Sequence, residues 1–135
     1  MQITFDPNVV SHATLIDLFL RSVDPTDAGG QFCDRGPSYR TAIFVGDASE
    51  QAQAQSAISK AQKELGQKIV TPVLNEGAFY AAGDDHQDYY KSSSRVVTRF
   101  GLKKKSSAYK LYRDACGRDQ RVKALWGSAA PFAGS

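Results

Sequence analysis

The sequence predicts an α/β sandwich in which helices pack on one face of a small sheet. Two observations carry this prediction. Segments of strand character alternate with segments of helical periodicity, in the order strand, helix, strand, helix, strand and then helices. The composition is that of a globular protein, since 41% of the 135 residues are hydrophobic and 23% are charged. A chain of this length usually forms one domain and buries its own core.

The N-terminal third predicts a strand, a helix and a second strand. Residues 2–5 alternate polar and apolar side chains, which is typical of a half-buried strand. Ser11 is a suitable N-cap for a helix that presents one wide apolar face over residues 15–20. A long loop, residues 29–37, then precedes a buried strand predicted for residues 39–45, which are rich in β-branched and aromatic side chains.

The clearest helix is predicted for residues 48–65. Its apolar side chains recur at helical spacing, and Gly66 stands where a C′ glycine belongs. Residues 69–74 predict another strand, with Pro72 indicating an edge or a bulge.

Three shorter helices are predicted in the C-terminal third. The first covers residues 86–93. The second is capped by Ser106 or Ser107, runs to about Cys116 and is closed by Gly117. The third is capped by Asp119 and closed by Gly127.

Charge is distributed unevenly along the chain. Residues 1–90 carry 6 basic and 12 acidic side chains, whereas residues 91–135 carry 11 basic and 2 acidic ones. A basic tail of this kind either contacts nucleic acid or a docking partner, or lies over the acidic remainder of the same domain. The second interpretation is favoured because the tail also holds apolar residues that need burial: Tyr109, Leu111, Tyr112, Val122, Leu125 and Trp126.

No segment has the length and apolar character of a membrane span, and the N-terminus lacks the features of a signal peptide. From these observations we expect no membrane partner, and a cytoplasmic location for the chain as given. The two cysteines are too few for a disulfide scaffold, and no Cys/His spacing predicts a zinc site.

The loop over residues 29–40 is the most informative segment for chemistry. It brings glycines, an acid, a thiol and a tyrosine together just before a buried strand, and binding residues favour such loops. Asp34 is a candidate to orient water or a polar substrate, and Tyr39 is a candidate hydrogen-bond donor. The alternative is a structural turn in which Asp34 caps backbone N–H groups and pairs with Arg35.

A second segment, residues 84–90, combines three aspartates with His86. These residue types bind metals, but the only other histidine, His12, belongs to a different predicted helix. We therefore expect no metal here and assign His86 a hydrogen-bonding role at a helix start.

An ordered set of short motifs resembles the peptide methionine sulfoxide reductase A family, which reduces the S epimer of methionine sulfoxide. The resemblance covers roughly residues 2–91, and residues 112–121 resemble a subgroup of the family. The motifs are Phe5-Asp6-Pro7, Leu18-Phe19, Asp24-Pro25-Thr26, Gln31, Asp34-Arg35-Gly36, Tyr39-Arg40-Thr41-Ala42-Ile43-Phe44, Ile69-Val70-Thr71, Phe79-Tyr80-Ala81-Ala82 and His86-Gln87-Asp88-Tyr89-Tyr90.

The resemblance implies an α/β sandwich with a ferredoxin-like core and thiol chemistry without a cofactor. In the family, a cysteine in a Gly-Cys-Phe-Trp motif attacks the sulfoxide sulfur, methionine leaves and a sulfenic acid remains. A second cysteine resolves this acid to a disulfide, which thioredoxin reduces. Asp34 and Tyr39 match the family's substrate-binding acid and tyrosine, and His86 and Tyr89 match a segment beside that pocket.

The chain departs from the family pattern at the nucleophile. It has no Gly-Cys-Phe-Trp motif, and neither Cys33 nor Cys116 stands in the nucleophile's setting. Cys116 is the candidate resolving thiol and Cys33 the alternative, while inert buried thiols are the other interpretation of both.

We expect residues 1–91 to form a reductase-like domain that is incomplete at its N-terminus. Residues 92–135 are then a basic helical extension packed on the same domain. Such a chain is expected to be inactive alone, because the covalent route needs the nucleophile. The alternative is a truncated remnant or a non-catalytic module that binds oxidised methionine. Nucleic-acid binding through residues 103–105 is disfavoured by the acidic remainder of the chain.

Overall fold

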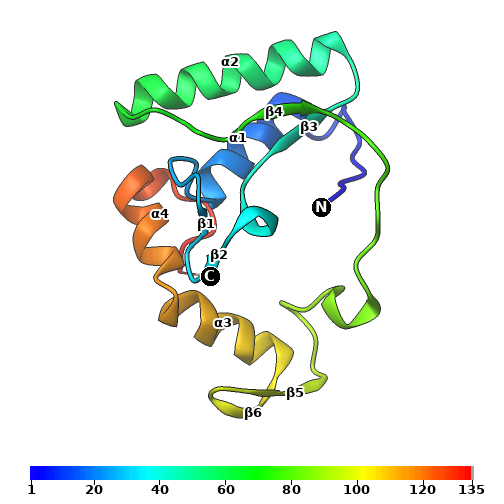
Figure 1. The fold of residues 1–135 in the computed structure, drawn as a ribbon, viewed down its shortest axis with the longest axis vertical. Helices are drawn as coiled ribbons and strands as arrows, with labels where there is room; N and C mark the ends of the chain where they lie inside the picture. Colours follow the sequence, from blue (N-terminus) through cyan, green and yellow to red (C-terminus); the bar gives the residue numbers. More distant parts are fainter. Residues whose placement is uncertain (135) are drawn as a thin grey trace.

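A computed structural model describes residues 1–134 and confirms a mixed α/β architecture (Figure 1). The strands form three separate two-stranded sheets rather than one sheet. The helices are α1 (His12–Ser22), α2 (Ala48–Leu65), α3 (Lys105–Ala115) and α4 (Arg118–Trp126). The sheets pair β1 (Gly30–Gln31) with β2 (Asp34–Arg35), β3 (Ile43–Val45) with β4 (Val73–Asn75), and β5 (Arg95–Thr98) with β6 (Gly101–Lys104). Three short 3-10 turns cover Pro37–Tyr39, Asp84–His86 and Gly127–Ala129.

The hydrophobic core lies between α1, α2, α4 and β3. Two buried alanines, Ala54 and Ala61, bring α2 close to its neighbours. Strand β3 turns Ile43 and Val45 into this core and leaves Phe44 exposed on its other face. The remaining core side chains come from α1, α4 and the segment before β4: Ile16, Leu20, Ile69 and Trp126. Figure 1 shows α2 lying across α1 and the β3–β4 pair.

Capping residues mark the start of both N-terminal helices and the end of α2. The Ser11 hydroxyl accepts a hydrogen bond from the Thr14 N–H at 3.1 Å, and the Asp47 carboxylate accepts one from the Glu50 N–H at 2.8 Å. Gly66 ends α2 with a φ of 62°, and its N–H donates to the Gln62 carbonyl at 2.9 Å. The prediction for residues 48–65 is therefore confirmed to the residue.

Three strand predictions need correction. Residues 2–5 form no strand, because no strand among residues 1–134 pairs with them, and Ile3 is 53% exposed. The strand predicted for residues 39–45 is only β3, since Tyr39 belongs to a 3-10 turn and residues 40–42 form no regular element. The strand predicted for residues 69–74 shifts to β4, which pairs with β3 in parallel.

The helix predicted for residues 86–93 is wrong. A 3-10 turn and further turns occupy this segment, and Asp88 has a φ of 51°, which a right-handed helix excludes. The β5–β6 hairpin was not predicted. Its turn depends on Gly101, whose φ is 85°. Helix α3 begins at Lys105, with Lys104 rather than a serine at the N-cap.

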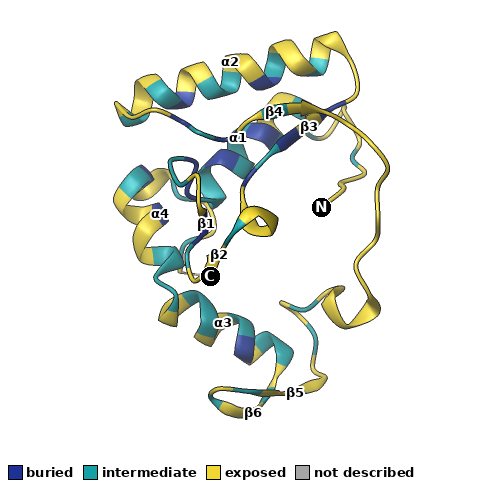
Figure 2. Cartoon of the chain, viewed as in Figure 1, coloured by how far each residue is buried: buried dark blue, intermediate teal, exposed yellow. Residues whose placement is uncertain are grey.

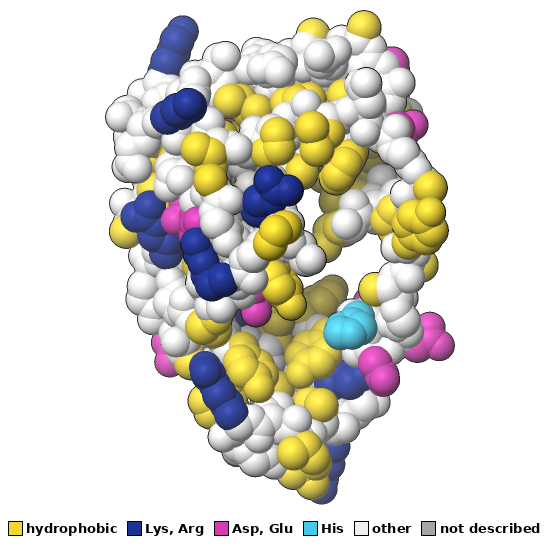
Figure 3. Space-filling model, in the orientation of Figure 1, with side chains coloured by type: hydrophobic (Ala, Val, Ile, Leu, Met, Phe, Trp, Pro, Cys, Tyr) yellow, Lys and Arg dark blue, Asp and Glu magenta, His cyan; other side chains and the backbone are white. Residues whose placement is uncertain are grey.

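Residues 74–88 run from β4 towards β5 with every side chain exposed, and we call them the arm. Figure 2 shows this segment as an exposed trace along one side of the molecule, and Figure 3 shows an open gap between it and the rest. No helix in the described part of the chain is long and apolar enough to cross a membrane.

Candidate functional site around the Cys33–Cys116 disulfide

The β1–β2 hairpin is a tight turn that only glycine permits at its start. Gly30 has a φ of 148°, and a Cβ there would lie 2.2 Å from the Asp34 carbonyl oxygen. Arg35 pairs with Asp27, not with Asp34 as the structural-turn alternative supposed. The hydrogen bonds from Arg35 and from the Gly29 N–H lower the pKa of Asp27. The Asp34 side chain is thus exposed and makes none of the hydrogen bonds found within residues 1–134.

A buried glutamine fixes the hairpin to the end of α1. The Gln31 amide accepts from the Asp24 N–H at 2.9 Å and donates to the Asp24 carbonyl at 2.8 Å. The Asp24 carboxylate in turn accepts from the Thr26 hydroxyl at 2.6 Å and from Arg121 of α4 at 2.6 Å. These paired groups, of which Gln31 and Asp24 are buried, connect the hairpin to α4.

The two cysteines form a disulfide with each other, and this bond is the main finding at the site. Cys33 lies at the tip of the hairpin and Cys116 at the end of α3, with their Cα atoms 5.2 Å apart. Sequence reasoning considered each thiol separately and missed the pair, because 83 positions separate them and no local pattern links them. Cys33 is exposed and Cys116 half-buried, so the interpretation as inert buried thiols is wrong.

A small cavity of about 120 Å³ opens beside the disulfide. It is lined by three aromatic, three charged and one sulfur-bearing residue: Phe32, Tyr109, Tyr112, Asp34, Arg113, Arg118 and Cys116. The guanidinium carbon of Arg118 lies 4.4 Å from the centroid of the Phe32 ring. Burial, and then the neighbouring Arg113, lower the pKa of Arg118.

Arg113 also lines the cavity, and two partners hold its guanidinium. It donates to the Tyr109 hydroxyl at 2.7 Å and pairs with Asp119. Burial opposes the charge of this guanidinium, but its hydrogen bonds to Asp119 and Tyr109 outweigh that effect and raise its pKa. The cavity therefore places fixed positive charge and one free carboxylate, Asp34, next to a sulfur–sulfur bond.

The other predicted site residues lie outside this cavity. Tyr39 is 52% exposed on the Pro37–Tyr39 turn, and His86 is exposed on the Asp84–His86 turn. The Tyr89 ring lies 5.6 Å from the Lys105 ammonium. Figure 1 places the turn that carries His86 across the open gap from the turn that carries Tyr39. The structure thus brings Asp34 together with Cys33 and Cys116. Tyr39, His86 and Tyr89 lie apart from this group.

Helix α4 also packs on the rest of the domain through two residues outside the cavity, Arg121 and Trp126. The Arg121 guanidinium donates to Asp24 and, at 3.1 Å, to the Thr26 hydroxyl. Trp126 is buried in the core, with the Arg21 guanidinium 4.5 Å from its ring centroid. The apolar residues of the tail indicated its packing on the domain, but no sequence signal named these partners.

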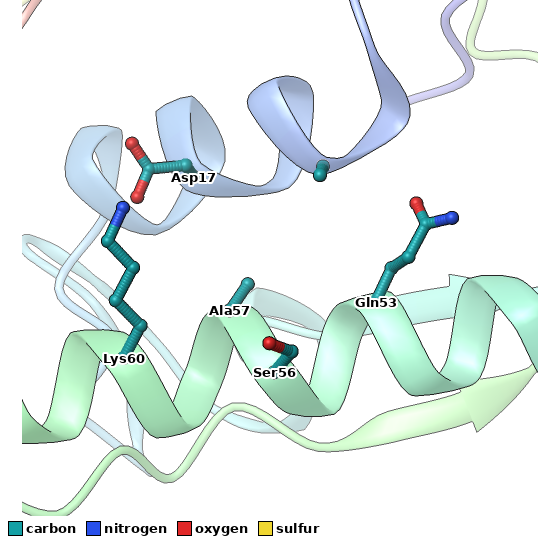
Figure 4. A pocket seen from close by; sticks show the side chains of 6 residues that line it. Asp17, Gln53, Ser56, Ala57 and Lys60 are labelled. Carbon is teal, nitrogen blue, oxygen red and sulfur yellow. The ribbon is translucent and has the colours of Figure 1, made fainter.

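A second hollow, of about 210 Å³, lies between α1 and α2 (Figure 4). It is lined by small and polar residues, with Lys60 extending towards Asp17 from the facing helix. It contains no thiol, and residues 1–134 hold no group of three or more side chains suited to bind a metal.

Comparison with known proteins identifies the family. Residues 1–124 match the family model described as peptide methionine sulfoxide reductase. The peptide methionine sulfoxide reductase MsrA 2 of Rhizobium meliloti is 42% identical over 96% of this chain and 60% of its own length. The MsrA 2 of Caulobacter vibrioides is 38% identical over 94% of this chain and 59% of its own length. The MsrA of Bacillus licheniformis is 38% identical over 94% of this chain and 65% of its own length.

The chain spans about 60% of the length of these curated relatives. The family model covers far more than half of the chain, from its first residue into α4. The chain belongs to the peptide methionine sulfoxide reductase family.

Proposed function

We propose that this chain is part of a peptide-methionine (S)-S-oxide reductase whose nucleophilic cysteine lies outside the 135 residues. The relatives are named as reductases, and the chain matches about 60% of their length without a Gly-Cys-Phe-Trp motif. The observation that carries the proposal is the Cys33–Cys116 disulfide beside the free carboxylate of Asp34. When this bond is reduced, the two cysteines are a pair of thiols that can be oxidised together to the disulfide of the structure.

The proposed chemistry begins on the substrate. The external nucleophile attacks the sulfoxide sulfur, the oxygen moves to the nucleophile as a sulfenic acid, and methionine leaves. Asp34 and Tyr39 are the proposed partners of the sulfoxide oxygen and of its proton; for Tyr39, which lies outside the cavity, the family resemblance supports this role. His86 and Tyr89 border the substrate. Free or protein-bound methionine S-sulfoxide is the proposed substrate.

The two cysteines then regenerate the nucleophile. The Cys116 thiolate attacks the sulfenic sulfur, forming a disulfide and releasing water. Cys33 attacks Cys116, which frees the nucleophile and gives the Cys33–Cys116 disulfide of the structure. A thioredoxin dithiol reduces that bond, and no cofactor enters. Exposure of Cys33 supports this last step, because thiol exchange needs access to the sulfur.

The exposed apolar surface supports a missing neighbour. Phe44 is 60% and Leu74 45% exposed, and they face each other in the β3–β4 register. Outer sheet faces of this kind are normally covered. We propose that a preceding segment covers this face and completes a ferredoxin-like core from residues 1–91, with residues 92–135 as its extension. No observation favours a non-catalytic binding module.

The experiment supplies the chain with the N-terminal segment of the Rhizobium meliloti relative and follows methionine release in a single turnover. We expect Tyr39→Phe and Asp34→Asn to slow this first step about 10²-fold to 10³-fold. Cys116→Ser leaves the first step intact and blocks turnover with thioredoxin, whereas dithiothreitol still supports it. Loss of the first release in Cys116→Ser, or unchanged turnover with thioredoxin, contradicts the role of this cysteine.

A further inference from the structure

The β5–β6 hairpin carries a positive charge that the proposed reductase chemistry does not use. Between Tyr89 and Arg113 the chain has eight lysines and arginines and no acid, counting Arg113 itself. The antiparallel register places Arg95 opposite Lys104. Figure 1 shows the hairpin at one end of the molecule, beyond α3.

Four side chains share the outer face of this hairpin, which we call the hairpin face. Residues two apart on a strand point to the same side, and directly paired residues do as well. The register pairs Arg95 with Lys104 and Val97 with Leu102, so a basic pair and an aliphatic pair lie next to each other. The opposite face, with Val96, is half-buried against α3.

The hairpin face is open. Val97 is 82% and Leu102 58% exposed, and Arg95 and Lys104 are exposed as well. Neither cation makes a side-chain hydrogen bond or an ion pair with any residue from 1 to 134. In Figure 3, apolar and basic atoms lie together at this end of the molecule. An exposed aliphatic pair beside two free cations is suited to an amphipathic, acidic partner.

Acidic side chains next to the hairpin face, Asp85 and Asp88, limit how large an acidic partner can be. Lys105, next to the hairpin face, donates to the Asp85 carbonyl at 2.8 Å, and Lys91 pairs with Asp88 at 2.9 Å. The Asp85 side chain is 99% exposed. Such charges act over a screening length of about 8–10 Å. A nucleic acid or an anionic bilayer extends beyond the hairpin face and meets these carboxylates, whereas a short peptide does not.

We propose that the hairpin face binds a short, extended acidic segment of another protein, with carboxylate and aliphatic side chains two residues apart. In an extended peptide this spacing matches that of Arg95 and Val97 along β5. The carboxylates pair with Arg95 and Lys104, and the aliphatic side chains cover Val97 and Leu102. The interaction weakens as salt rises.

The test measures fluorescence anisotropy of a labelled peptide with the repeat Glu-Ser-Val-Ser, in which glutamate and valine lie two residues apart, added to the full chain. The double variant Arg95→Glu/Lys104→Glu is expected to weaken binding about tenfold or more. The matched control, Lys63→Glu/Lys68→Glu, makes the same charge change on exposed lysines of α2 and the loop after it. It is expected to bind like the parent chain. Val97→Ser/Leu102→Ser weakens binding without changing charge.

Three outcomes overturn the proposal. Equal loss in the control shows a net-charge effect only. Equal binding of a peptide with the same composition in blocks shows that the spacing does not matter. Binding to phosphatidylserine vesicles or single-stranded DNA without binding to the Glu-Ser-Val-Ser peptide shows that the hairpin face serves another class of partner. Circular dichroism of each variant confirms that the fold is retained.

Discussion

The core and the arm show how differently two parts of one chain use their apolar residues. Leu20 of α1 is 1% exposed inside a cluster that α1, α2, α4 and β3 share. In the arm, Phe79 is 57% and Tyr80 87% exposed. Apolar side chains of this size contribute about 1.5–3 kcal/mol each when buried and nothing when left in water. The core side chains therefore stabilise the fold without a further partner. The apolar side chains of the arm would do so only if another segment covered them, and a preceding segment of the kind proposed above could provide that cover.

The largest difference is expected from truncating one leucine in each region. Leu20→Ala removes a fully buried side chain and leaves a cavity, which costs about 2–5 kcal/mol of unfolding free energy. Leu74→Ala, at the start of the arm and 45% exposed, is expected to cost about 0.5 kcal/mol or less. Urea unfolding of the two variants measures both values. Equal costs contradict the division between core and arm.

A second pair of variants compares two glycines. Gly30→Ala forces a Cβ against the Asp34 carbonyl at a φ of 148° and should destabilise the chain by about 1–3 kcal/mol. Gly77→Ala, in the arm, has no heavy atom within 4 Å of the added Cβ and is expected to change stability little. Thermal unfolding followed by circular dichroism separates them. A neutral Gly30→Ala shows that the hairpin is not held as described.

The smallest expected effect is the loss of stability at low pH through Asp119. Burial raises the pKa of Asp119, but the hydrogen bonds from Arg113 and the Gly134 N–H outweigh it and leave the pKa below the ordinary 3.8. The folded state thus binds fewer protons than the unfolded state near this pH, so the stabilisation is present above pH 3.8 and is lost as pH falls further. The destabilisation caused by Asp119→Asn should shrink below pH 3.8 in urea titrations. A constant difference across pH contradicts the ion pair.

Sequence patterns correctly predicted those helices whose ends depend on residues close by in the sequence. Helix α2 was predicted to the residue because Asp47 and Gly66, its caps, are adjacent to it in sequence. The Cys33–Cys116 disulfide and the Arg121–Asp24 pair join residues far apart, and no local pattern indicates either. The strand predicted for residues 2–5 had suitable alternation but found no partner strand among the described residues. Alternation of polar and apolar side chains shows only that a segment is suited to a strand. The strand forms only when another strand pairs with it.

The sequence predicted only part of the candidate site, because several of its residues meet only through contacts between distant segments. Asp34 was assigned from its loop and from the family resemblance, and the structure places it beside both cysteines. Phe32, Arg113 and Arg118 were missed, because they meet only when α3 and α4 pack against the hairpin. Roles for Tyr39, His86 and Tyr89 rest on the resemblance and stay predictions.

One measurement tests the central claim most directly: reduction of methionine S-sulfoxide with dithiothreitol by the 135-residue chain, with and without the N-terminal segment of the Rhizobium meliloti relative. The account predicts no turnover above buffer for the chain alone and turnover when the fused segment supplies a Gly-Cys-Phe-Trp motif. Replacing the cysteine of that motif by serine should abolish the gain. Turnover by the chain alone that survives the Cys33→Ser/Cys116→Ser double variant would contradict the account.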